Sequence, residues 1–255
     1  MKERGKNGMK INYQEYHLSK REWCIYIVQG ILLCVIVNHL FYQNAVFYLF
    51  MIPIPILWVK WRKLDRKNKR KKELGYQFKN ALNSLSVSLR AGYSIENSLI
   101  EAEKDMRKWN GDSSEIVQEL SYINRQIKVS IPAEDLLTDF GIRSDVEDIK
   151  NFASVFAIAR RMGGNLAEIV QDTAAQLSEK IDAERAIDTA VSAKKFEQMV
   201  MSLMPFGMIF YMQLSSPGFF DAIYGTVFGV IFMTACLVLY AAAFWFGRRL
   251  VRIEV

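Results

Sequence analysis

The chain has 255 residues, enough for one folded domain together with membrane spans. Hydrophobic residues make up 51% of it and charged residues 24%, which argues against a uniform soluble protein and indicates separate apolar and charged segments. The net charge of +6 is unevenly distributed, because residues 73–197 carry 15 basic and 21 acidic side chains. The basic excess therefore flanks the apolar stretches, which favours contact with anionic lipid headgroups over binding to nucleic acid.

The N-terminal part of the chain predicts a basic segment followed by a membrane hairpin. Residues 1–22 are rich in Lys and Arg, and residues 23–42 contain no Asp, Glu, Lys or Arg, which is long enough to span a bilayer. A second apolar stretch at 45–59 contains two prolines and has Trp58 and Trp61 at its end, as in an interfacial aromatic belt. A signal peptide is the alternative for the first stretch, but its apolar part is long for one and a second stretch follows at once.

The rest of the chain predicts a second hairpin with the same orientation. Residues 60–72 form a linker with nine basic residues and one acidic residue, and the tail at 248–255 is also basic. Because Lys and Arg stay on the cytoplasmic side, both termini and residues 73–197 are expected in the cytoplasm. We therefore expect an all-α integral membrane protein whose hairpins, at 23–59 and 198–247, contain four transmembrane helices, at 23–42, 45–59, 199–214 and 222–246.

The domain at residues 73–197 is expected to be a cytoplasmic bundle of about six helices. Its apolar residues recur at spacings of three and four, as in the stripe formed by Ile95, Leu99, Ala102, Met106 and Trp109. Turn and capping signals divide the helices. These signals are Gly92 with Ser94, an N-cap at Ser113, a short helix at 133–140 ended by Gly141, and capping-box spacing at Ser144 with Glu147 and at Asn165 with Glu168.

The last helical run of the domain has an unusual length. From Leu166 to about Leu203 no Gly or Pro interrupts it, which corresponds to roughly 55 Å of helix. One helix is therefore expected to continue from the cytoplasmic domain into the third span. Our hypothesis is that this helix couples the domain mechanically to the membrane.

No pattern of reactive residues stands out in the chain. A phosphate-binding G-x-x-x-x-G-K-[ST] motif is lacking, and the three cysteines lie in apolar stretches without a neighbouring His cluster. The carboxylates of residues 73–197 lie among Lys and Arg and are expected on solvated helix faces. The span centres lack the ionisable groups that transporters and intramembrane proteases need. We therefore expect no catalytic residue, no cofactor and no bound metal, and a protein that is not an enzyme.

Two short motifs resemble a known family. Residues 88–99 read SLRAGYSIENSL, and residues 160–170 read RRMGGNLAEIV before a long charged helix and two apolar stretches. In this order and spacing they resemble the type II secretion system F domain (GspF/PilC-like), and most of all the TadB/TadC branch of Tad (Flp) pilus assembly. The matching positions are Arg90, Ala91, Gly92, Ser94, Gly163, Gly164, Asn165, Leu166 and Glu168.

The resemblance implies an inner-membrane platform protein of a type IV-like pilus or secretion machine. It also implies the partners, which are a cytoplasmic secretion ATPase, a second F-domain protein or another copy of this chain, pilin subunits and membrane lipids, but no nucleic acid. The motif glycines would then shape tight turns and would not react. A membrane-bound signalling protein with a helical cytoplasmic domain is the alternative, and a small transporter subunit is a weaker one. The short predicted loops count against the signalling protein, and the lack of charged residues in the spans counts against the transporter subunit.

Overall fold

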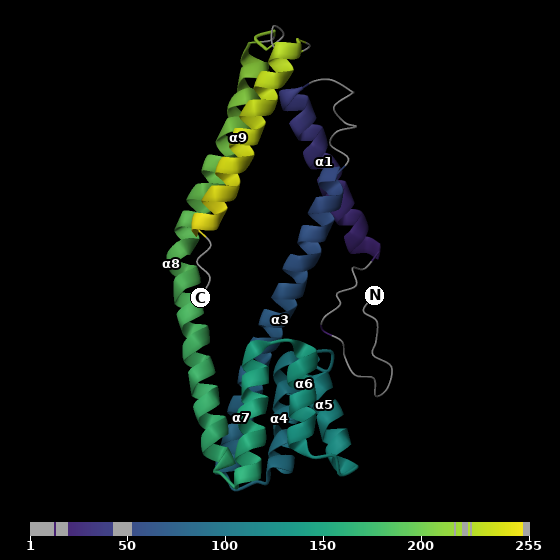
Figure 1. The fold of residues 1–255 in the computed structure, drawn as a ribbon, viewed down its shortest axis with the longest axis vertical. Coiled ribbons are helices and arrows are strands. Elements are labelled where there is room, and N and C mark those ends of the chain that lie inside the picture. Colours follow the sequence, from purple (N-terminus) through teal and green to yellow (C-terminus); the bar gives the residue numbers. More distant parts are fainter. Residues whose placement is uncertain are drawn as a thin grey trace. The chain divides into compact units, whose positions relative to one another are not determined.

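The computed structural model describes residue 13 and residues 20–42, 53–216, 218–220, 224 and 226–251, and within these residues it is all-helical (Figure 1). The predicted all-α fold class is thus confirmed. The helices are α1 (Lys20–Phe41), α3 (Pro53–Arg90), α4 (Ile95–Asn110), α5 (Glu115–Lys128), α6 (Ala133–Ser144), α7 (Glu147–Met162), α8 (Leu166–Ser215) and α9 (Val227–Val251).

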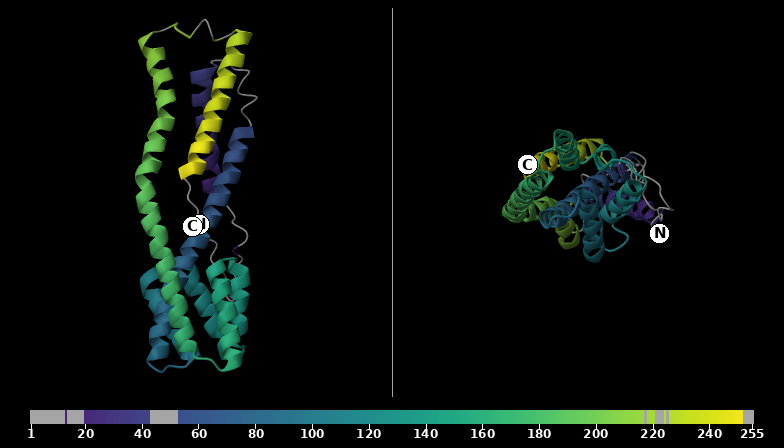
Figure 2. Two further views of the ribbon diagram at one scale, coloured as in Figure 1. Left: turned by 60° about the vertical axis from the view of Figure 1, so that its left-hand side comes forward. Right: turned by 90° about the horizontal axis from the view of Figure 1, so that it is seen from below.

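The chain divides into two compact units. The first consists of residues 1–17 and 63–183, and the second consists of residues 18–62 and 184–255. Helices α3 and α8 contribute residues to both units. The predicted uninterrupted helix is confirmed, because α8 continues without a break from Leu166 through Pro205 to Ser215 (Figure 2).

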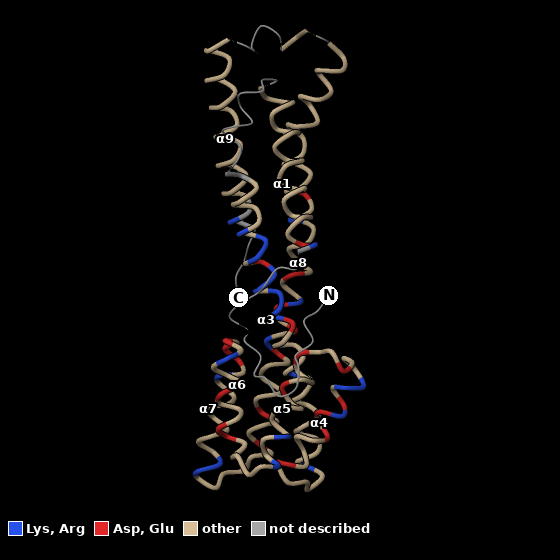
Figure 3. Tube along the Cα trace, turned by 90° about the vertical axis from the view of Figure 1, so that its right-hand side faces the viewer, with Lys and Arg blue, Asp and Glu red and all other residues tan. Residues whose placement is uncertain are grey.

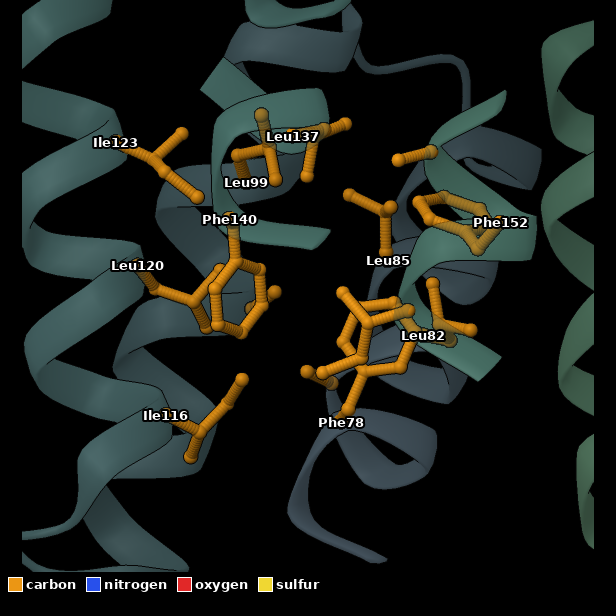
Figure 4. Packing of buried hydrophobic residues seen from close by; sticks show 14 of the residues in the cluster. Phe78, Leu82, Leu85, Leu99, Ile116, Leu120, Ile123, Leu137, Phe140 and Phe152 are labelled. Carbon is orange, nitrogen blue, oxygen red and sulfur yellow. The ribbon is translucent and has the colours of Figure 1, made fainter. Parts of the chain in front are cut away.

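The first unit is built around an aromatic and aliphatic core (Figure 4). The Phe78 ring lies 6.1 Å from the Phe140 ring and 5.5 Å from the Phe152 ring, both in edge-on arrangements. A cavity of about 20 Å³ lies among these side chains. It has room for about one water molecule, but only apolar residues line it, so it should stay dry and offers no polar group to a ligand. The predicted stripe on α4 is buried up to Met106, whereas Trp109, in the last turn, is 65% exposed.

Three of the predicted helix ends were wrong by a few residues. The N-cap of α5 is Ser114, not Ser113: the Ser114 Oγ accepts a 3.3 Å hydrogen bond from the Val117 amide. The turn before α5 needs the additional residue because the Ser114 amide closes it by bonding to the Gly111 carbonyl. The predicted cap at Ser144 fails because Ser144 belongs to α6, where its hydroxyl donates to the Gly141 carbonyl.

Gly141 does not end its helix. Helix α6 continues to Ser144 and ends at Asp145, whose φ of 52° is left-handed. A Cβ at Gly141 would lie 3.1 Å from the Cα of Lys150 in α7. The glycine therefore allows two helix backbones to approach closely, which sequence spacing alone does not distinguish from a helix end.

The second unit contains the apolar helices. Residues Arg21–Phe41 of α1 and Val227–Gly247 of α9 are long and apolar enough to cross a membrane, in agreement with the first and fourth predicted spans. Lys and Arg line α3 and the end of α9, while the body of α9 carries no charge (Figure 3). The predicted third span, 199–214, is the end of α8. Of the predicted second span, 45–59, residues 45–52 lie outside the described residues, and residues 53–59 form the start of α3.

Polar contacts tie α1 to the other helices of the second unit. The Tyr224 hydroxyl donates a 2.5 Å hydrogen bond to the Leu40 carbonyl near the end of α1, and the Gln213 amide donates to Tyr224 at 3.0 Å. The hydroxyls of Tyr42 and Thr234 lie 3.0 Å apart. Such contacts satisfy groups at the end of a helix that apolar surroundings would otherwise leave unpaired.

Candidate functional site

The first family motif forms the turn between α3 and α4. Arg90 is the last residue of α3, and Ala91 continues into the turn. Gly92 has a φ of 86°, a left-handed conformation in which a Cβ is unfavourable. The Tyr93 amide donates to the Ser88 carbonyl at 3.2 Å, so the turn satisfies carbonyls at the end of α3. The Ser94 Oγ accepts a 3.3 Å bond from the Asn97 amide, so the predicted N-cap of α4 is confirmed.

The second family motif forms the turn between α7 and α8. Gly163 has a φ of 70°, and the Gly164 amide donates to the Ala159 carbonyl at 2.9 Å. The Asn165 Oδ1 accepts a 3.4 Å bond from the Glu168 amide, while the Asn165 Nδ2 donates to the Glu168 Oε2 at 3.2 Å. The first bond confirms Asn165 as the N-cap of α8, whereas the second joins the two side chains and does not involve the Asn165 backbone amide, as a full capping box would. Leu166, the first residue of α8, packs against the core of the first unit.

Arg160 links these turns to a third one. Its Nη2 donates to Glu96 Oε1 at 3.1 Å, and its Nε lies 3.6 Å from Glu134 Oε2. Glu96 lies in the first turn of α4, Glu134 in the first turn of α6 and Arg160 in the last turn of α7. The connections α3–α4, α5–α6 and α7–α8 therefore meet at one end of the unit (Figure 1). We call this end, which contains residues 91–94, 129–132 and 163–165, the motif end.

Apolar side chains are exposed at the motif end. Tyr93 is 53% exposed and Met162 is 81% exposed, and Val129 and Ile158 are also exposed. Apolar groups gathered beside charged ones are typical of a surface that binds another protein. Among the described residues, no group of three His, Cys, Asp or Glu side chains is placed to hold a metal ion. The geometry of the motif end therefore suits binding.

A buried charged cluster lies elsewhere in the first unit, and the sequence analysis missed it. Glu119, expected on a solvated face, is only 1% exposed. Both of its carboxylate oxygens accept from Arg143, at 2.9 and 2.8 Å, and Arg143 Nε also donates to Asp139 at 2.7 Å. One signal was available in the sequence: Glu119 lies three residues after Ile116 and four before Ile123, on the buried stripe of α5.

Tyr13 completes the buried cluster. It is 1% exposed, and its hydroxyl donates a 3.1 Å bond to Glu119 Oε1. Arg70 lies over the Tyr13 ring at 5.1 Å and donates to Glu115 at 2.5 Å. Burial, reinforced by the charge of Glu119, raises the pKa of Tyr13, so its hydroxyl remains a donor at any physiological pH.

Arg143 stays charged in spite of its burial. Burial is the largest influence on its pKa and lowers it, but hydrogen bonds and charges from Glu119 and Asp139 outweigh burial and raise the pKa. The two carboxylates together hold one guanidinium, which is the arrangement that makes a buried charge tolerable.

Comparison with known families decides what the motif turns belong to. Residues 81–214, just over half of the chain, match the family described as type II secretion system (T2SS), protein F, and this range contains both motif turns. The chain belongs to this family. Neither the curated proteins nor the solved structures gave a match.

Family membership indicates where the apolar helices α1 and α9 are located in the cell. Proteins of this family serve as platforms of type II secretion or type IV pilus-like machines, and they generally work with ATPases and other F-domain proteins in membrane assemblies. Together with α1 and α9, membership indicates an inner-membrane protein.

Proposed function

We propose that this chain is the inner-membrane platform of a Tad (Flp)-type pilus machine and that it couples a cytoplasmic ATPase to pilin assembly. The observation that carries the proposal is the pair of family motif turns, which share one end of the first unit beside exposed apolar side chains. In this proposal the motif end receives the ATPase or a second F-domain protein. No residue needs to react, because the machine's chemistry takes place in the ATPase.

The proposed topology has four spans in two hairpins, with residues 73–197 in the cytoplasm. Tyr13 supports it, because a side chain buried against Glu119 must lie on the same side of the membrane as α5. If α1 crosses the bilayer, the chain has to cross back before Arg70, which also contacts Tyr13. A second span between residues 42 and 63 meets this requirement, as the apolar stretch at 45–59 predicts.

The proposed coupling element is helix α8. It begins at the Asn165 N-cap of the motif end and continues as one helix to Ser215. Because α8 has no Gly or Pro from Leu166 to Met204, a displacement at Leu166 would be transmitted along its axis to the residues just before Pro205, where a helix bends most readily. In this proposal residues 199–214 and α9 contact pilin subunits within the membrane.

Co-purification of the full chain with its secretion ATPase in mild detergent tests the proposal. We expect the wild type to retain the ATPase. In the variants Tyr93→Asp and Met162→Asp the amount of co-purified ATPase should fall by about tenfold or more, because each variant places a charge in an apolar contact. Trp109→Asp is the matched control: it adds the same charge at a side chain as exposed, at the opposite end of α4, and should retain the ATPase.

Two results would contradict the proposal. If the folded wild-type protein does not associate with the ATPase, the ATPase is not its partner. If all three variants lose the co-purified ATPase equally, the motif end is not the contact surface.

A further inference from the structure

Arg62 lies between two aromatic rings in the second unit. Its guanidinium carbon lies 5.2 Å from the centroid of the Trp58 ring, one turn earlier on α3, and 5.9 Å from the centroid of the Tyr26 ring on α1. The ring of Trp61 lies 5.8 Å from that of Trp58. The Trp58 and Tyr26 rings, which lie on two helices, are both within the distance at which a guanidinium is attracted to an aromatic face.

Two hydrogen-bond donors at this position lack an acceptor within the part of the chain that the structure describes. The Nε of Arg62 and the indole Nε1 of Trp58 are both buried, and neither has a hydrogen-bond partner among the described residues. A buried donor without an acceptor costs about 1–3 kcal/mol, and more when the group is charged, so native proteins rarely leave such donors unpaired. Both groups are donors only, and one carries a full positive charge, so the chemistry that satisfies them is an anionic oxygen acceptor.

A phosphate oxygen fits these donors best. Arginine pairs with phosphate through its fork of N–H groups, and an indole N–H can donate to a second oxygen of the same phosphate. A phosphate could belong to a lipid headgroup or to a small soluble molecule. The surroundings favour the lipid, because Ile56 and Leu57, just before Trp58, are exposed apolar side chains that suit acyl chains.

We propose that Arg62 and Trp58, with Tyr26 as the second wall, form a binding site for the phosphate of an anionic phospholipid at the cytoplasmic face of the membrane. Charge near the site has the matching sign, since Lys60 and Lys63 flank Arg62 on α3. This site goes beyond the proposed function, because it requires neither the ATPase nor a pilin. It makes the basic linker a specific lipid contact in addition to a diffuse positive charge.

Native mass spectrometry of the full chain in mild detergent tests the site. Phosphatidylglycerol is titrated into delipidated protein, with phosphatidylcholine and soluble glycerol 3-phosphate as comparison ligands. We expect one tightly held phosphatidylglycerol on the wild type. Arg62→Gln should weaken it by about tenfold or more, and Trp58→Phe, which keeps the ring and removes the donor, by about threefold or more.

Lys60→Gln is the matched control, because it removes one positive charge from an exposed side chain two residues from Arg62. It should weaken binding less than twofold. Equal weakening by Lys60→Gln and Arg62→Gln would overturn the site in favour of a general basic surface. The proposal also fails if the wild type holds no tight phosphatidylglycerol, or if phosphatidylcholine binds as tightly.

Glycerol 3-phosphate distinguishes the source of the phosphate. If it displaces the lipid at comparable concentration, the site binds a soluble phosphate and the lipid proposal is wrong. Circular dichroism checks that each variant keeps its helices. Should Arg62→Gln fail to fold, the Trp58→Phe result decides, and unchanged lipid binding by that variant overturns the proposal.

Discussion

The Tyr13 hydroxyl donates a 3.1 Å hydrogen bond to Glu119 although the two residues are 106 positions apart in the chain. This contact places Tyr13 in the core of the first unit, beside Phe140, whose ring lies 6.5 Å away. The burial of Tyr13 therefore limits how the chain can pass through a membrane.

Substitution of Tyr13 should destabilise the first unit in two distinct steps. Tyr13→Phe loses one hydrogen bond and should lower the free energy of unfolding by about 1 kcal/mol. Tyr13→Ala also empties a buried ring position and should lower it by about 3–5 kcal/mol. Denaturant unfolding of the full chain in detergent measures both values. Tyr93→Phe, at an exposed tyrosine, is the control, and a Tyr13→Ala value as small as that control would contradict the burial.

The Glu119–Arg143 pair should show strong coupling. Arg143→Met leaves the buried Glu119 carboxylate without its cation and should cost about 3–5 kcal/mol. Adding Glu119→Gln removes the charge but keeps an acceptor for Tyr13, so the double variant should be more stable than Arg143→Met alone. A double-mutant cycle on the same unfolding measurement tests this order, and simple additivity would argue against a direct ion pair.

The glycines of the two motif turns should not tolerate a side chain. Gly92→Ala and Gly163→Ala force a Cβ into positive φ and should each cost about 1–2 kcal/mol. Gly75→Ala is the control, because Gly75 lies within α3 and an added Cβ meets only Val146 Cγ1, at 3.9 Å. That variant should stabilise the protein by about 0.5–1 kcal/mol. Thermal unfolding distinguishes the two directions, and stabilisation by all three would refute the turn geometry.

Asp145 should give the first unit an acid-sensitive contribution to stability. Hydrogen bonds from Lys150 and Lys71, at 2.7 and 2.5 Å, lower its pKa to about 2. A lowered pKa means that the contribution is fully present above about pH 4 and is lost as the pH falls toward 2. Because the Asp145 side chain is 41% exposed, the effect should stay below about 1 kcal/mol.

Asp145→Asn tests this contribution, because Asn also tolerates the left-handed backbone of residue 145. The stability difference between wild type and variant should shrink as the pH is lowered from 5 to about 2. A stability difference that stays constant over that pH range would show that it does not arise from the contacts of Asp145 with the two lysines.

Local signals in the sequence predicted much of this structure. The helical stripes, the glycine turn at Gly92 and the caps at Ser94 and Asn165 depend on residues within a few positions of one another, so spacing is sufficient to find them. The errors at Ser113 and Gly141 have a common origin. A turn can need one more residue, and a glycine can serve helix contact as well as a helix end.

Long-range partners lay beyond sequence reasoning. The position of Glu119 on the buried stripe of α5 indicated its burial, but its partners Arg143 and Tyr13 are distant in the sequence and became known only from the structure. The contact between Arg62 and Tyr26 likewise joins two helices, and no signal in the sequence indicated it. The spacing of charges predicted a basic linker but gave no indication of a specific geometry within it.

The most direct test of the account is the side of the membrane on which the first unit lies. In a variant whose Cys24, Cys34 and Cys236 are replaced by serine, single cysteines are introduced by Asp112→Cys and Ser216→Cys, both at exposed positions. A membrane-impermeant maleimide is then applied to spheroplasts. We predict labelling of Ser216→Cys in intact spheroplasts and of Asp112→Cys only after permeabilisation, and labelling of Asp112→Cys from outside would contradict a cytoplasmic domain between two hairpins.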